Sequence, residues 1–131
     1  MQEAKVKADV RKNRLYVVLA GFFDDDEARQ AADQVIQEIK KLRPGFDIIN
    51  DISGFRPTTQ KGAQEMVRAQ RFARAAGVDR VIRIVPSETI GSMQFARTSK
   101  QAGYEADTAP SIAEADKMLG PWWLKRAGQK V

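Results

Sequence analysis

The chain has 131 residues, of which 43% are hydrophobic and 30% charged, which is the composition of one folded domain of ordinary size. It contains neither cysteine nor histidine, which excludes disulfides, thiol catalysis, Ser-His-Asp chemistry and the usual zinc sites. Lysine and arginine exceed aspartate and glutamate by 22 − 17 = 5, but these charges are spread along the chain. The sequence therefore favours a non-enzymatic protein of the reducing cytoplasm, with no cofactor and no metal.

The predicted elements open with a hairpin and then alternate between helices and strands. Residues 5–10 alternate between polar and apolar side chains and residues 14–20 are mostly apolar, so we expect two antiparallel strands here. The later elements follow in chain order: a helix over 24–42, a strand over 46–50, a helix over 58–77, a strand over 81–85 that Pro86 and Ser87 end, a helix over 91–102, an edge strand over 104–109 and a helix over 111–119.

This order predicts an α/β fold. We expect a single domain over residues 1–120, with a mixed sheet of four or five strands opened by a β-hairpin and about four helices. The tail over 121–131 begins with Trp122 and Trp123 beyond Gly120-Pro121, and it has no periodic partner. No apolar run approaches the roughly 20 residues of a membrane span, and the first residues lack the core of a signal peptide.

The most informative segment follows the strand over 46–50. It is a polar loop, punctuated by Gly54 and Pro57, that runs to the start of the next helix. In open α/β sheets, ligands and partners bind at loops on the carboxyl ends of strands, and a helix N-terminus favours anions. We therefore expect the working site here. The candidate contact residues are Asp24, Asp51, Ser53, Gly54, Thr58, Thr59, Gln60 and Lys61.

Four motifs in this order resemble the STAS family, the sulfate-transporter and anti-sigma-factor-antagonist domains, in its stage II sporulation AA-like branch. Residues 21–24 (Gly-Phe-Phe-Asp) are similar to the family's Gly-x-x-Asp, and residues 51–55 (Asp-Ile-Ser-Gly-Phe) to its Asp-Leu-Ser-Gly-Val. Residues 71–77 resemble the end of its second helix, and residues 111–115 the start of its last one. The resemblance covers about residues 14–119.

The resemblance implies a STAS-like domain that binds a protein similar to an anti-sigma factor or serine kinase, and so acts in signalling and regulation. The contact surface would combine residues 21–26, residues 53–61 and the exposed face of the second helix. One position departs from the family: its phosphorylated serine falls on Gln60 and the preceding acid on Thr59, while Gly62 is kept. The usual phosphoserine switch therefore does not transfer, and Thr58 and Thr59 are the nearby hydroxyls that would serve as shifted acceptors.

Each candidate also has a structural interpretation. Either threonine would cap the second helix, and Asp24 and Asp51 would cap a helix or hold a turn rather than share a weak Mg²⁺ site. Without interleaved aromatic residues, the basic residues predict a solvated face or a surface for an acidic protein rather than nucleic acid. They are Arg68, Arg71, Arg74, Arg80 and Arg83.

Two aromatic groups support a second hypothesis, in which the protein carries or senses a small apolar or lipid-like ligand. Phe22, Phe23 and Phe55 would line an apolar pocket or belong to ordinary core. Trp122 and Trp123 would anchor the tail at a membrane interface, fill a partner's groove, or fold back over the sheet.

Overall fold

The computed structural model describes residues 2–85 and 89–124. Its elements are β1 (Glu3–Asp9), β2 (Arg14–Gly21), α1 (Asp25–Ile39), β3 (Asp47–Phe55), α2 (Gln60–Ala75), β4 (Val81–Ile84), α3 (Ile90–Ala102), β5 (Asp107–Ala109), α4 (Ile112–Leu119) and α5 (Trp122–Leu124). The predicted α/β class is confirmed, with a mixed five-stranded sheet and four helices besides the short α5. Pro86 and Ser87, which were expected to end the strand before them, lie outside the described residues.

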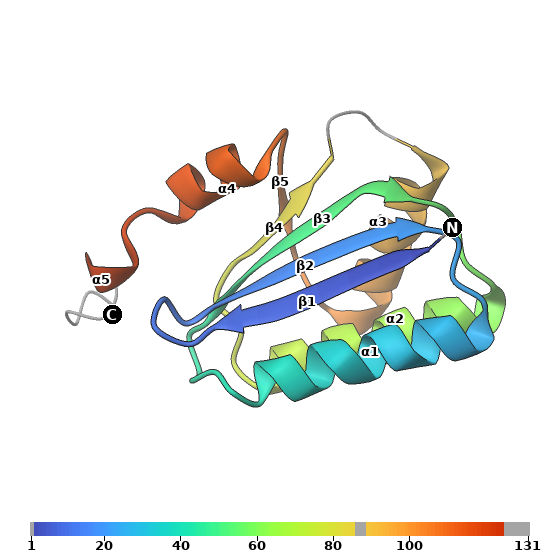
Figure 1. The fold of residues 1–131 in the computed structure, drawn as a ribbon, viewed down its shortest axis with the longest axis horizontal. Coiled ribbons are helices and arrows are strands. Elements are labelled where there is room, and N and C mark those ends of the chain that lie inside the picture. The colour runs from blue at the N-terminus through green and yellow to red at the C-terminus, as the bar shows by residue number, and fades with distance from the viewer. Residues whose placement is uncertain (1, 86–88, 125–131) are drawn as a thin grey trace.

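The sheet has the strand order β1-β2-β3-β4-β5. The opening pair is antiparallel, as the hairpin pattern predicted, and each later pair is parallel. Parallel strands are joined by right-handed crossovers, so a sheet that grows in one direction places its crossover helices on one face. Helices α1, α2 and α3 accordingly lie side by side on that face (Figure 1). Helix α4 follows the last strand, and it covers β3, β4 and β5 from the other face.

The core divides along these two faces. Between the sheet and α1–α3, apolar side chains that include Leu15, Ile39 and Phe46 form one cluster, and Phe23, Phe55 and Phe95 belong to a second. Under α4, Ile49, Ile82 and Ile84 meet Ala115. Strand β4 is buried over its whole length, which confirms that its β-branched run is covered on both faces.

Strand β3 is longer than the sequence predicted. We expected a loop from Asp51 onward, but the strand continues to Phe55 because Ala20 and Gly21 of β2 pair with Gly54 and Phe55. A Cβ at position 54 would lie 3.1 Å from the Cβ of Ala20, so glycine allows this close pairing. The extension moves the working loop to residues 56–59.

Two other boundaries also differ from the prediction. The first helix ends at Ile39 rather than Leu42, and the following residues form a turn. The edge strand is Asp107–Ala109 rather than 104–109, because Tyr104 is buried in the core between the sheet and the helices. No helix among the described residues has the length and apolar character needed to cross a membrane.

Candidate functional site

The two loops that the sequence singled out lie side by side at the carboxyl ends of β2 and β3. The backbone N–H of Arg56 donates to the Gly21 carbonyl at 3.1 Å, and the Thr58 hydroxyl donates to the Phe23 carbonyl at 2.6 Å. Helix α3 closes the third side, because the Gln94 side chain accepts from the Thr58 N–H at 2.8 Å. We call this region the contact edge and define it as residues 21–26, residues 53–61 and the first turn of α3, residues 90–93.

Large apolar side chains are exposed along the contact edge. Phe22 is 45% exposed, Ile90 68% and Met93 45%. The first turn of α3 lies directly against the loop, since a Cβ at Gly91 would be only 2.3 Å from the Phe55 carbonyl oxygen. The end of the sheet therefore combines exposed apolar side chains with exposed polar ones, which include Gln60 and Lys61.

Thr58 and Thr59 both have structural partners. Thr59 is the N-cap of α2, where its hydroxyl accepts from the Gly62 N–H at 2.9 Å and donates to an Asp25 carboxylate oxygen. Thr58 packs so closely on α2 that a Cβ at Gly62 would lie 2.1 Å from its Oγ1. This contact gives a packing reason for the glycine, independent of any phosphoacceptor. A phosphate on Thr59 would stand against Asp25 and repel it.

Asp24 and Asp51 serve as a helix cap and a turn holder. Asp24 caps α1 in a capping box with Glu27, and Asp51 accepts from both the backbone N–H and the hydroxyl of Ser53, at 3.0 and 2.7 Å. Asp51 alternates with Asn50, which faces α1–α3, so its side chain lies on the opposite face of the sheet. No cluster of three metal-ligating side chains occurs in the part of the chain that the structure describes.

The sequence predicted that all five basic residues lie on a solvated face, but the structure places only some of them on the surface. Arg71 and Arg74 of α2 are exposed, and so are Arg97 and Lys100 of the neighbouring α3. Within residues 2–85 and 89–124, no carboxylate lies within ion-pairing distance of these four cations, which we call the basic face. Arg68 instead pairs with Asp33 and Glu65, both at 2.7 Å.

Arg83 is a correction to that expectation, because it is only 6% exposed. It lies in β4, where alternate side chains point toward α3, and its Nη2 donates to Ser99 Oγ at 2.5 Å. Its guanidinium also lies 5.5 Å from the centre of the Phe95 ring. Burial lowers the pKa of the Arg83 guanidinium. The sequence placed Arg83 in the buried strand over 81–85, and that strand period was the signal for its burial.

A cavity of about 70 Å³ lies between the sheet and α1–α3. Phe23 and Phe55 line it, together with Phe95, whereas Phe22 does not and is exposed. The lining is apolar except where Asn50, Thr58, Gln70 and Tyr104 reach it. Sequence reasoning did not identify Asn50 or Gln70, because a lone amide in a strand or helix has no spacing pattern that marks it.

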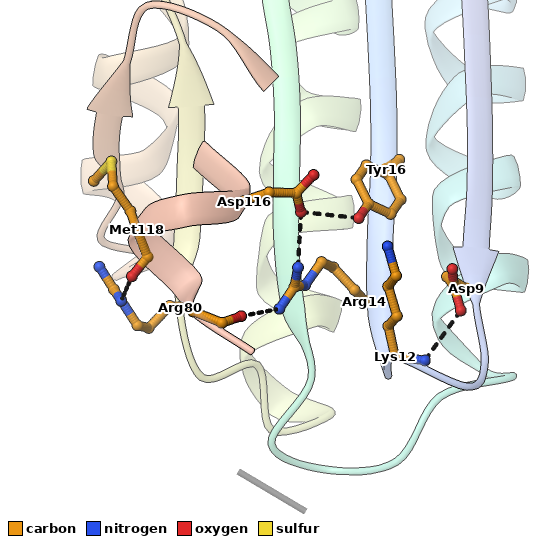
Figure 2. A network of polar contacts seen from close by, with 8 residues as sticks. Asp9, Lys12, Arg14, Tyr16, Arg80, Asp116 and Met118 are labelled. Carbon is orange, nitrogen blue, oxygen red and sulfur yellow. Dashed lines mark hydrogen bonds and ion pairs between the residues drawn. The ribbon is translucent and has the colours of Figure 1, made fainter. Parts of the chain in front are cut away.

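The other face of the sheet holds a second buried arginine, and this one is paired. Figure 2 shows Arg14 and Tyr16 of β2 converging on the carboxylate of Asp116 in α4, at 2.7 and 3.0 Å. Arg14 also donates to the Gly120 carbonyl at 3.3 Å. Arg80 extends these contacts by donating to the Met118 carbonyl at 2.8 Å (Figure 2). These bonds attach α4 to the sheet.

The tail folds back to the hairpin at its start. Trp122 is partly buried, with the Arg11 guanidinium 5.3 Å from its ring centre, while Trp123 is 57% exposed and meets Trp122 edge-on at 5.7 Å. The part of the predicted tail beyond Leu124 lies outside the described residues.

In comparison with known proteins, no protein-family model matches the chain, and no curated protein matches its sequence. The resemblance to STAS domains therefore stays a prediction.

Proposed function

We propose that this chain is a cytoplasmic, non-enzymatic regulatory module, similar to an anti-sigma factor antagonist, that binds an acidic protein through its contact edge and basic face. The observation that carries the proposal is the exposure of Phe22, Ile90 and Met93 at one end of the sheet. Exposed apolar side chains that gather beside polar loops mark protein-binding surfaces more often than isolated ones do.

The charge of the neighbouring surface indicates the kind of partner. The four cations of the basic face lie on α2 and α3, and α3 begins at the contact edge. A partner with a complementary acidic surface would be steered onto this side of the molecule, and its apolar side chains would cover the contact edge. A serine kinase or anti-sigma factor remains the partner class that the resemblance suggests.

The proposed control differs from the usual phosphoserine switch. Gln60 occupies the acceptor position as the first residue of α2, and it is exposed. The hydroxyls of the adjacent residues Thr58 and Thr59 already hold structural hydrogen bonds. Binding would therefore be set by the concentration and charge of the partner rather than by modification of this loop.

The experiment is a pull-down from the native host with the tagged full chain, followed by mass spectrometry and by affinity measurements on the recovered partner. Arg71→Glu with Arg97→Glu should weaken binding at least ~10-fold at low salt, because each replaces an attraction with a repulsion. Gln60→Glu should weaken it less, since it adds one charge at the contact edge. The matched control is Lys117→Glu on α4, which lies on the other face of the sheet.

The proposal predicts one stoichiometric partner whose binding both contact variants weaken and the Lys117→Glu control leaves unchanged. Ile90→Asp should abolish the same complex. Recovery of the protein alone, or of a partner insensitive to all three contact variants, would overturn the proposal.

A further inference from the structure

The cavity between the sheet and α1–α3 has an apolar end and a polar end. Three aromatic rings form the apolar end: the Phe55 ring centre lies 6.1 Å from that of Phe23 and 4.9 Å from that of Phe95. The volume is about 70 Å³. This is about half of the roughly 150 Å³ of an engineered apolar cavity that holds one benzene molecule, so only a ligand of a few non-hydrogen atoms would fit.

The polar end contains acceptor atoms that the described residues do not satisfy. Asn50 of β3 is 7% exposed and Gln70 of α2 is 6% exposed, and both side chains line the cavity. Neither Asn50 Oδ1 nor Gln70 Oε1 accepts a hydrogen bond within the described part of the chain. Buried polar atoms are nearly always bonded, so two such atoms at one end of a cavity indicate a polar group that binds there.

Arg83 is not itself a lining residue of the cavity, but it lies behind this polar end and adds a positive charge there. It stands opposite Asn50 in the register of β3 and β4, and it shares Ser99 Oγ with Gln70, whose Nε2 donates to that oxygen at 3.2 Å. Among the described residues, Arg83 Nε has no acceptor and no carboxylate lies within ion-pairing distance of the guanidinium. Buried arginines are almost always paired with an anion. None of the residues that the structure describes therefore supplies a negative charge to the polar end of the cavity.

We propose that the cavity is a binding site for a short-chain monocarboxylate, with the carboxylate at the Arg83, Asn50 and Gln70 end and the carbon chain among the phenylalanine rings. A carboxylate is planar and accepts the paired donors of a guanidinium. Asn50 and Gln70 can meet it through their NH₂ groups, because a side-chain amide presents a donor or an acceptor according to how it is turned. A neutral alcohol would satisfy the amides and leave Arg83 without a counter-ion.

The test compares three probes of equal size: propionate, 1-butanol and n-butylamine. Each is titrated into the ¹⁵N-labelled full chain, with the amide resonances of residues around the cavity followed by NMR. Propionate should bind at least ~10-fold more tightly than either other probe, since hydrogen bonds to a charged group exceed neutral ones by about that factor. The shifted resonances should include those of Asn50, Phe55 and Gln70.

Variants measure the contribution of the Arg83 charge to affinity separately from that of the apolar end of the cavity. Arg83→Met should lower propionate affinity at least ~10-fold and leave 1-butanol affinity within about twofold, because it removes the charge and keeps the apolar end. Arg97→Met, on the exposed face of α3, is the matched control and should change neither affinity. If Arg83→Met does not fold, the three-probe comparison on the unaltered chain decides alone.

Equal affinity for propionate and 1-butanol would overturn the proposal, because the cavity would then act as an apolar space only. Absence of binding by all three probes, with water found in the cavity, would overturn it as well. The outcome does not depend on the contact edge, since the titration needs no protein partner.

Discussion

The two buried arginines show how similar positions in one sheet acquire different roles. Arg14 in β2 is 3% exposed and faces α4, where Asp116 neutralises it. Arg83 in β4 is equally buried but faces α3, where its only hydrogen-bond partner among the described residues is a serine hydroxyl. Neither Nε has an acceptor in the part of the chain that the structure describes, so the two arginines differ in whether a carboxylate pairs with the guanidinium. An arginine with a protein counter-ion holds elements together, whereas one without it stands ready for an anion from outside.

The largest expected effect is the loss of the Arg14 counter-ion. Asp116→Ala should lower the free energy of unfolding by about 3 kcal/mol, near the lower end of the range for a buried pair because the Asp116 carboxylate is partly exposed. Chemical denaturation measures it. Glu114→Ala on the same helix is the control and should change the free energy by less than about 0.5 kcal/mol, since its pair with Lys117 is exposed. Equal effects of both variants would contradict the structural role assigned to Arg14.

The next effect concerns the tyrosines beside the two arginines. Burial raises the pKa of Tyr104 and, together with the bond to Asp116, that of Tyr16 above the ordinary value of 10.0. Above about pH 10 the unfolded chain releases these protons while the folded chain keeps them, so the folded state loses stability as the pH rises. For Tyr104, whose pKa is raised strongly, the slope should approach about 1.4 kcal/mol per pH unit, and Tyr16 should add to it in the same direction. Chemical denaturation at pH 9, 10 and 11 measures this loss of stability. Tyr104→Phe should remove the part of the slope that Tyr104 contributes.

A smaller effect is expected at the tail, which continues from the paired face of α4. Trp122→Ala should lower the free energy of unfolding by about 1 kcal/mol, because it removes the contact with Arg11 and partly buried ring area. Trp123→Ala should change it by less than about 0.5 kcal/mol, since the ring is mostly exposed. Thermal melts of the two variants give the comparison. A larger loss at Trp123 would show that the tail packs differently from the structure.

The smallest net change should come from Arg83 itself. Without added anion, Arg83→Met should leave the free energy of unfolding unchanged or raise it by up to about 1 kcal/mol, because an apolar side chain replaces a buried charge that has no counter-ion. The same denaturation assay used for Asp116→Ala measures it. A loss of about 3 kcal/mol would mean that Arg83 is as structural as Arg14, and the comparison of the two arginines would fail.

The sequence determined the order of elements and the class of the fold, because hydrophobic periodicity, helix caps and glycine stops are local signals. The hairpin, the buried strand over 81–85, the cap at Asp24 and a cap at one of the two threonines before α2 could all be predicted in this way. The end of β3 could not, because its last residues are a strand only through pairing with Ala20 and Gly21.

The candidate sites also contain some features that the sequence predicted and others that it did not. The meeting of residues 21–26 with residues 53–61 was predictable, because loops after parallel strands lie at one end of a sheet. That the first turn of α3 joins them was not predicted. The tertiary structure alone decided that Asn50, Gln70 and Arg83 come together inside the molecule, since they lie on a strand, a helix and a second strand. It also decided that Asp116 reaches Arg14, 102 residues away in the chain, while no carboxylate of the described residues reaches Arg83. Charge compensation depends on which side chains meet in three dimensions, and no local pattern records that.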